Sequence, residues 1–324
     1  MTNPDSPLVS VVIPCYNRSG IIQKTLDSVL NQSLQDFEII LVDDFSDDID
    51  QLKKVLAKMN SAKIRLLEHT HNQHGGAARN TGIKAAQGKY LALLDSDDIW
   101  HPDKLTMSIP YCLHSKDVVY TQLSGFGYIF PNQAKKQNEQ VCDYLICNKG
   151  AMQSSTLLMH TKFAQKVLFN PDLTRFQDYD FTLRLENYGA NFVFINQTLT
   201  MMSSHNEPRI SDGGSIKPAL EWLKIANNMS KKARAQFYLD RVAKILLVQG
   251  EKKKILTFLP EDIQANMEWK LKLKFYLMRY MPQYLFNSLQ FIKKVLKNIL
   301  PQKIKNVIKE KIFNLKSSNT PLSF

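Results

Sequence analysis

The first hundred residues alternate short apolar runs with amphipathic stretches, and this order limits the folds open to the chain. The run Leu8–Ile13 (LVSVVI) is rich in β-branched residues, which is typical of a strand buried on both faces. From about Ser19 to Asn31 the apolar residues recur at helical spacing. The same alternation continues with expected strands at Phe37–Val42, Ile64–Glu68 and Tyr90–Leu94 and expected helices at about Asp48–Met59 and Gly75–Ala86. This β-α-β-α-β-α-β order predicts an α/β fold with a mostly parallel, right-handed sheet flanked by helices.

Polar residues follow three of these expected strands at the point where each strand ends. They are the turn Pro14–Arg18, the pair Asp43 and Asp44, and the run Asp95-Ser96-Asp97-Asp98. Ligands of such sheets bind beyond the carboxyl ends of the strands, so we expect these residues to share one edge.

The run from Asp95 to Asp98 is costly to fold without a partner, because crowded carboxylates repel one another and lose water. A hard cation such as Mg²⁺ or Mn²⁺ removes this cost, since it prefers carboxylate and phosphate oxygens. The run therefore predicts a metal site. The alternative is an acidic loop that caps a helix starting near Pro102.

The pattern is less regular from about Tyr111. Strand-like runs occur at Asp117–Thr121, Phe126–Phe130, Ser155–Met159 and Asn191–Ile195, and a helix is expected at Asp178–Tyr188, closed by Gly189. Beyond Ile216 the pattern is helical. We therefore expect one unit over residues 1–215 and a helical, basic region over 216–324.

The charge is concentrated in this last region. Residues 251–324 carry 15 Lys and Arg against 5 Asp and Glu, or +10 of the net +12. Such asymmetry indicates a polyanionic partner, either nucleic acid or an anionic membrane face. The segments Tyr284–Leu300 and Lys303–Leu315, separated by Pro301, have lysine-flanked apolar stripes that suit an anionic bilayer surface.

Aromatic residues near these segments would add interfacial anchors, namely Trp269, Tyr276, Tyr280 and Tyr284. The alternative is that the two tail segments pack on the preceding unit. The four cysteines lack paired metal spacing, and we find neither an export signal nor a run of about 18 apolar residues, so a cytoplasmic setting is expected.

Three segments together resemble the inverting glycosyltransferases of family two, which have a GT-A fold. They are VSVVIPCYN, VDDFSDD and GGAARNTGIKAAQGKYLALLDSDDIWHPDKL, in matching order and spacing over residues 8–105. The resemblance implies a nucleotide-sugar half at about 8–105 and an acceptor half at about 106–215. It also implies a bacterial surface-polysaccharide enzyme at the inner face of the cytoplasmic membrane, using Mn²⁺ or Mg²⁺.

The reaction implied is transfer of a hexose (glucose, galactose or N-acetylhexosamine) from a UDP-sugar. The acceptor would be a hydroxyl of a lipid-linked or surface glycan, as in O-antigen, capsule or lipooligosaccharide synthesis. In similar enzymes the turn after the first strand, here Pro14, Tyr16 and Asn17, shapes the nucleotide pocket, and Asp44 accepts hydrogen bonds from uracil. The alternative for Asp43 and Asp44 is a turn with a helix N-cap.

The resemblance also assigns the acidic run and the helix before it. His74 sits where relatives carry a basic donor contact, or is a solvated loop histidine, and Arg79 is expected to brace Asp95 or Asp97. Asp95 and Ser96 would approach the donor, and Asp97 or Asp98 would hold the metal. Sequence alone does not separate the last two.

The catalytic base implied by the resemblance is Asp178, in the segment FQDYD that is similar to the family's ED motif. Gln177 departs from this motif, because relatives commonly carry Glu there. The alternatives are that Asp178 is a helix N-cap, or that Asp180 is the base. In the following loop, His205 is a candidate metal ligand and Arg209 a candidate diphosphate ligand, or both are ordinary loop residues.

Two other functions fit less well. A nucleotidyltransferase that forms sugar nucleotides needs a glycine-rich basic loop after the first strand, and Pro-Cys-Tyr-Asn-Arg is not such a loop. A nucleic-acid-binding protein would show arginine interleaved with aromatic residues. The tail instead combines lysine with aliphatic residues, so no nucleic-acid partner is expected.

Overall fold

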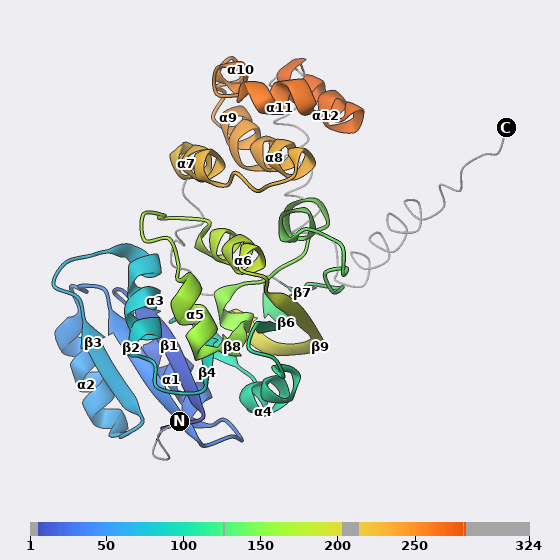
Figure 1. The fold of residues 1–324 in the computed structure, drawn as a ribbon. Coiled ribbons are helices and arrows are strands. Elements are labelled where there is room, and N and C mark those ends of the chain that lie inside the picture. Colours follow the sequence, from blue (N-terminus) through green and yellow to red (C-terminus); the bar gives the residue numbers. More distant parts are fainter. Residues whose placement is uncertain (1–5, 126, 203–213, 281, 283–324) are drawn as a thin grey trace.

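A computed structural model describes residues 6–125, 127–202, 214–280 and 282, and it confirms the α/β class (Figure 1). Nine strands form one sheet in the order β3-β2-β1-β4-β8-β6-β9-β5, with β7 paired to β6. In Figure 1 the segments coloured from blue to yellow make up the sheet and its covering helices, and helices α7 to α12 gather at one end.

The N-terminal half of the sheet is parallel, as predicted. Its strands are β1 (Val9–Cys15), β2 (Phe37–Asp43), β3 (Ile64–Glu68) and β4 (Tyr90–Leu93), and the helices between them are α1 (Ile22–Leu30), α2 (Ile49–Met59) and α3 (His74–Ala85). Alternate residues of β1 enter different hydrophobic clusters, Val11 with α1 and Val12 with α3. Helix α3 packs closely on β1, because a Cβ at Gly82 would lie 2.4 Å from Cγ1 of Val12.

The second half of the sheet mixes both strand directions. Its strands are β5 (Asp98–Trp100), β6 (Asp117–Gly125), β7 (Tyr128–Phe130), β8 (Leu158–His160) and β9 (Asn191–Met202). Strand β8 runs antiparallel to both β4 and β6, whereas β6 and β9 are parallel. The helices and short helical turns here are α4 (Lys104–Ser108), η1 (Ile109–Tyr111), η2 (Asp143–Cys147), η3 (Ser154–Thr156), α5 (Thr161–Val167) and α6 (Gln177–Asn187).

One predicted strand is wrong in its first half. Residues expected as a strand at Ser155–Met159 begin instead with the 3-10 turn η3, and the strand starts only at Leu158. The backbone N–H and the side-chain hydroxyl of Thr156 both donate to the carbonyl of Gln153 and close this turn. The prediction for the end of α6 is confirmed, because Gly189 has a φ of +84° and its N–H donates to the carbonyl of Glu186.

The described part of the C-terminal region is helical, as expected. It comprises α7 (Lys217–Ile225), α8 (Lys231–Tyr238), η5 (Leu239–Ala243), α9 (Lys244–Val248), α10 (Lys254–Thr257), α11 (Glu261–Asn266) and α12 (Trp269–Tyr280). The Trp222 ring lies 5.9 Å from that of Phe176 and 4.7 Å from that of Phe237, so these helices share a core with the segment before α6. The boundary at residue 215 stays a prediction.

Among the described residues, no helix has both the length and the apolar content to cross a membrane. The predicted tail segments Tyr284–Leu300 and Lys303–Leu315, with Tyr284, lie outside the described residues.

Candidate active site

The acidic run lies in the turn between β4 and β5, and the Ser155 side chain holds both of its ends. The Ser155 hydroxyl accepts from the backbone N–H of Asp95 at 3.0 Å and donates to Oδ2 of Asp98 at 2.6 Å. On the other side, the Thr25 hydroxyl of α1 donates to the carbonyl of Ser96 at 3.0 Å. Asp95 and Asp97 are left partly exposed, whereas Asp98 is only 6 % exposed. The alternative of a helix cap is wrong, because α4 begins at Lys104 after Asp103.

The turn η3 is itself fixed from three directions. The carbonyl of Ser155 accepts from Nε1 of Trp100 at 2.8 Å and from the hydroxyl of Thr200 at 3.0 Å. The carbonyl of Thr156 accepts from Nζ of Lys104 at 2.8 Å. This turn was not predicted; the available signal was three consecutive hydroxyl residues, Ser154 to Thr156, before an apolar run.

Ser154, the other serine of η3, holds the expected base. Its hydroxyl donates a short hydrogen bond to Oδ1 of Asp178, and its backbone N–H donates to the same atom at 3.3 Å. Asp178 lies in the first turn of α6, but the N-cap is Phe176, so the helix-cap alternative is wrong. Burial raises the pKa of Asp178, and the nearby charge of Asp95 raises it further; Arg79 and the Ser154 hydrogen bonds oppose this shift.

Arg79 joins the base region to the acidic turn. Its Nη2 donates to Oδ1 of Asp95 at 2.5 Å, as the sequence indicated, and its Nη1 donates to Oε1 of Gln177 at 2.7 Å. The side chain is buried against the Phe169 ring, 5.3 Å from its centre. Gln177 therefore accepts a hydrogen bond from the Arg79 guanidinium, but unlike the Glu expected at this position it carries no charge.

Asp180, the rival base, has a different environment. It is 8 % exposed, and its Oδ2 is buried without a hydrogen-bond partner among the described residues. Burial raises the pKa of Asp180, and Arg184 and Trp222 partly oppose this shift. Arg184 belongs to α6 and Trp222 to α7, so neither neighbour is part of the acidic turn.

The residues expected to bind the nucleotide lie at the ends of β1 and β2. Oδ1 of Asp44 lies 2.8 Å from Nδ1 of His69 and accepts from the N–H of Gln73 at 2.9 Å. The Nε2 of His69 lies 2.8 Å from the Thr81 hydroxyl, so the ring is held at both nitrogens. His69 was not predicted, and its place just after β3 is the signal that was overlooked.

The turn after β1 is tied to the loop after β2 by Asn17. Its side chain donates to Oδ2 of Asp47 at 3.1 Å and accepts from the N–H of Asp47 at 2.8 Å, and its own N–H donates to the Ser46 hydroxyl. Asp43 accepts from the N–H of Ser46 at 2.9 Å, so the turn alternative holds for Asp43, whereas the N-cap position of α2 is occupied by Asp48.

The remaining residues of this end differ in exposure. Pro14 pairs with Val42 in the β1–β2 register, and Tyr16 beyond it is 46 % exposed. His74 is exposed at the start of α3, with a φ of +68°. Because β2, β1 and β4 are neighbours and parallel, their carboxyl ends bring all of these residues to one edge of the sheet. His205 and Arg209 lie outside the described residues.

A metal would rely on few protein ligands here. Among the described residues no three His, Cys, Asp or Glu side chains are clustered as a closed metal site. Mg²⁺ commonly takes one or two carboxylates and completes its shell with water and substrate phosphates, so a partly exposed carboxylate such as Asp97 fits this role.

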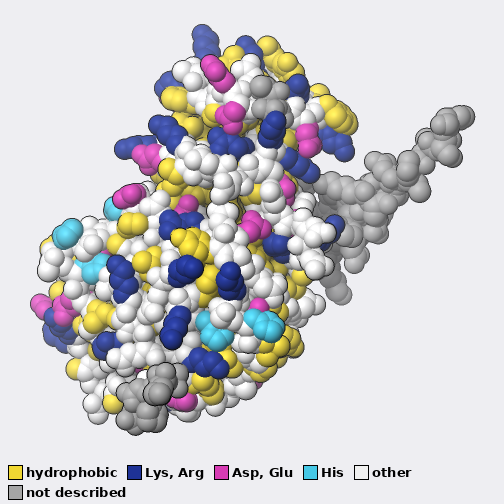
Figure 2. Space-filling view, viewed as in Figure 1, with side chains coloured by type: hydrophobic (Ala, Val, Ile, Leu, Met, Phe, Trp, Pro, Cys, Tyr) yellow, Lys and Arg dark blue, Asp and Glu magenta, His cyan; other side chains and the backbone are white. Residues whose placement is uncertain are grey.

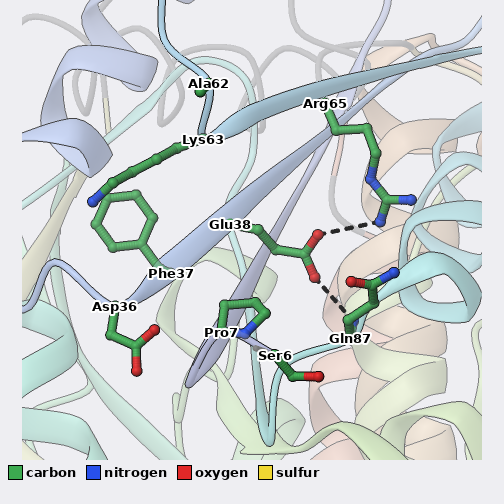
Figure 3. Close-up of a pocket in the computed structure, with 9 residues that line it drawn as sticks. All are labelled: Ser6, Pro7, Asp36, Phe37, Glu38, Ala62, Lys63, Arg65 and Gln87. Carbon is green, nitrogen blue, oxygen red and sulfur yellow. Dashed lines mark hydrogen bonds and ion pairs between the residues drawn. The ribbon is translucent and has the colours of Figure 1, made fainter. Parts of the chain in front are cut away.

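A pocket at the opposite end of the strands is not a candidate for the active site. It is lined by residues before β1, at the start of β2 and around β3, with Glu38 at its centre (Figure 3). Glu38 accepts from Arg65 at 3.2 Å and from the N–H of Gln87 at 2.9 Å, so its charge is already engaged. The pocket lies at the amino ends of the strands, where ligands of such sheets do not bind.

The fold and the acidic edge are those of a glycosyltransferase of the GT-A class. The model of glycosyl transferase family 2 matches residues 10–176, and the chain belongs to this family. This membership rules against the nucleotidyltransferase and nucleic-acid-binding alternatives.

Curated relatives agree with this assignment. The chain is 34 % identical to the amylovoran biosynthesis glycosyltransferase AmsB of Erwinia amylovora over 66 % of its own length and 76 % of that protein. It is 38 % identical to the UDP-Glc:alpha-D-GlcNAc-diphosphoundecaprenol beta-1,3-glucosyltransferase WfgD of Escherichia coli, over 34 % of its own length and 42 % of that protein. The structure of Staphylococcus aureus TarS 1–349 with UDP-GlcNAc shares the fold at a TM-score of 0.63 and 17 % identity, covering 86 % of this chain and 91 % of that one.

Proposed function

We propose that this enzyme transfers a hexose (glucose, galactose or N-acetylhexosamine) from a UDP-sugar to an acceptor hydroxyl, with inversion at the anomeric carbon. The observation that carries the proposal is the continuous set of contacts from Asp178 to the acidic turn. Ser154 holds Asp178, its neighbour Ser155 holds both ends of the turn, and Arg79 links Asp95 to the residue beside Asp178. These contacts support a mechanism in which the base and a diphosphate-binding turn are held close together.

Asp44 supports the choice of a uridine donor. A carboxylate accepts hydrogen bonds, and the uracil ring offers an imide N–H. The Asp44 side chain is buried and fixed by His69 and the Gln73 N–H, so it is already oriented before a nucleotide arrives. The name of the relative WfgD, which specifies UDP-Glc, agrees with this choice.

We assign Asp97 as the main ligand of Mn²⁺ or Mg²⁺. Asp97 is partly exposed, whereas Asp98 is buried and accepts from Ser155, which suits a residue that shapes the turn. His205 would complete the ligand set. When bound, the cation offsets the negative charge that develops on the departing diphosphate.

Asp178 would act as the general base. Its carboxylate takes the proton of the acceptor hydroxyl, the acceptor oxygen bonds to the anomeric carbon, and UDP leaves with the electrons of the broken C–O bond. A raised pKa suits this task, because a base works best when its pKa approaches the operating pH.

The acceptor proposed is a lipid-linked or surface glycan under assembly at the inner face of the cytoplasmic membrane. The name of AmsB refers to amylovoran biosynthesis, and that of WfgD to alpha-D-GlcNAc-diphosphoundecaprenol as the acceptor. The basic C-terminal region is compatible with this location, because cations near a membrane are attracted to anionic lipids.

A donor screen with the full chain tests the proposal. We expect hydrolysis or transfer with a UDP-sugar, no comparable turnover with GDP-sugars, and loss of activity in excess chelator with recovery on adding Mn²⁺. Asp97→Ala and Asp178→Asn should each abolish transfer, and only Asp178→Asn should still bind UDP with Mn²⁺. Full activity in Asp178→Asn, or turnover unaffected by chelator, would overturn the corresponding assignment.

A further inference from the structure

Helix α12 carries apolar residues on two opposite faces. Leu271, Phe275 and Met278 pack against the core of the helical region. On the other face, five large apolar side chains are between 52 and 68 % exposed. These five are Trp269, Leu273, Tyr276, Leu277 and Tyr280, spaced so that they form one stripe along the helix. We call this stripe the α12 face.

Basic residues border the α12 face on both sides. By helical spacing, Lys270 lies along one border, and Lys272 and Arg279 lie along the other. Nζ of Lys270 lies 5.5 Å from the centre of the Trp269 ring, and Cζ of Arg279 lies 5.0 Å from the centre of the Tyr280 ring. The twelve residues of α12 include no Asp or Glu, and Figure 2 shows hydrophobic and basic side chains together over this end of the molecule.

We propose that the α12 face docks on the surface of an anionic lipid bilayer. A cluster of exposed aromatic and leucine side chains is unusual on a purely solvated helix. Tyrosine and tryptophan favour the membrane–water interface, leucine enters its apolar edge, and flanking lysine and arginine pair with anionic headgroups. The opposite face stays packed on the protein, so the helix would dock without leaving its place in the fold.

This inference rests on the proposed function only for its purpose, which is to hold the enzyme beside a lipid-linked acceptor. The docking itself needs neither donor nor metal. Its failure can therefore be distinguished from failure of the proposed transfer reaction.

Tryptophan fluorescence gives a direct test, because the chain has three tryptophans and Trp100 and Trp222 are buried. In the full chain without lipid, acrylamide should quench Trp269. Adding vesicles with about one third phosphatidylglycerol should shift its emission to the blue and allow quenching by brominated lipid. Pure phosphatidylcholine vesicles should do so far less, and Trp269→Phe should lose the response.

Co-sedimentation with the same anionic vesicles tests the face as a whole. The triple variant Trp269→Gln, Leu273→Gln, Leu277→Gln should lower the partition coefficient about tenfold or more, because it removes the inserted apolar groups. The control Leu113→Gln, Val248→Gln changes exposed apolar residues elsewhere and should leave binding unchanged. Two further double variants test the charges. Lys270→Gln with Lys272→Gln should weaken vesicle binding, whereas Lys54→Gln with Lys58→Gln should leave it unchanged.

Three results would overturn the proposal. The first is that Trp269 is already shielded from acrylamide without lipid, which is expected if another segment of the chain or a second copy covers the face. The second is unchanged vesicle binding in the triple variant. The third is an equal effect of the two lysine pairs on vesicle binding. Sedimentation velocity without vesicles identifies a second copy as the occupant.

Discussion

Nη2 of Arg79 lies 2.5 Å from Oδ1 of Asp95, so the cation of α3 fixes the first carboxylate of the acidic turn. The same guanidinium reaches Gln177 beside the expected base. A lysine cannot make both contacts, because its single ammonium lacks the fork of the guanidinium. We predict that Arg79→Lys lowers kcat/KM about 100-fold.

The matched control is Arg65→Lys, which alters a guanidinium paired with Glu38 at the opposite end of the strands. It should leave kcat/KM within about twofold of the parent, because no substrate is expected there. Near-equal losses in both variants, or loss of the folded state in Arg79→Lys by circular dichroism, would remove the evidence for a specific role.

The raised pKa of Asp178 predicts an acidic limb in the pH profile of kcat/KM. The base works only when deprotonated, so activity should rise as the pH increases through its pKa. The Ser154 hydrogen bond stabilises the charged carboxylate. Ser154→Ala should therefore raise this pKa and move the limb to higher pH, whereas Ser33→Ala, at a distant exposed hydroxyl, should not. A limb that moves to lower pH in Ser154→Ala would contradict the assignment.

Gln177 offers a second way to move the same limb. Gln177→Glu places a negative charge beside Arg79 and near Asp178, so it should raise the pKa of Asp178 and shift the limb upward. Activity above the limb should persist, since glutamate still accepts from Arg79 and loses only the bond from Nε2 to the carbonyl of Leu173. Gln177→Met loses the hydrogen bonds to Arg79 and to the carbonyl of Leu173 without adding charge, so its plateau should fall while its limb moves less. Profiles recorded on the three proteins distinguish charge from hydrogen bonding.

The parallel half of the fold was predictable because each strand there is a short, mainly apolar run followed by its own turn. The expected strand Ile64–Glu68 matches β3, and the ends of the others agree within two residues. The carboxylates after β2 and β4 were also predictable, because parallel strands bring their carboxyl ends to one edge.

The turn η3 was not predictable in the same way. Ser155 bonds to Asp98, 57 positions earlier, and Ser154 bonds to Asp178, 24 positions later. These contacts override the strand pattern of the apolar run that follows. Sequence spacing does not predict such pairings. The burial of Lys104 was not predictable either, because a lysine at the start of a short helix is expected to be exposed.

Lys104 is instead fully buried, with Nζ 2.8 Å from the carbonyl of Thr156 and 5.9 Å from the centre of the Trp100 ring. Burial lowers the pKa of this lysine from 10.5 to about 7. Between these two values the unfolded chain binds more protons at this site than the folded protein does. The free energy of unfolding should therefore rise with pH through this window, and the stabilisation is absent below pH 7.

Lys104→Met removes this titration together with the hydrogen bond to Thr156. The lost bond lowers stability by a constant amount, so the informative quantity is the difference in unfolding free energy between parent and variant as a function of pH. From pH 7 to 9 this difference should move in favour of the parent by about 1 kcal/mol per pH unit. Chemical denaturation at several pH values measures it, with Lys24→Met as the control at an exposed lysine. Parallel curves for the parent and Lys104→Met would show that Lys104 keeps its ordinary pKa, and that the carbonyl of η3 is held by a permanently charged ammonium.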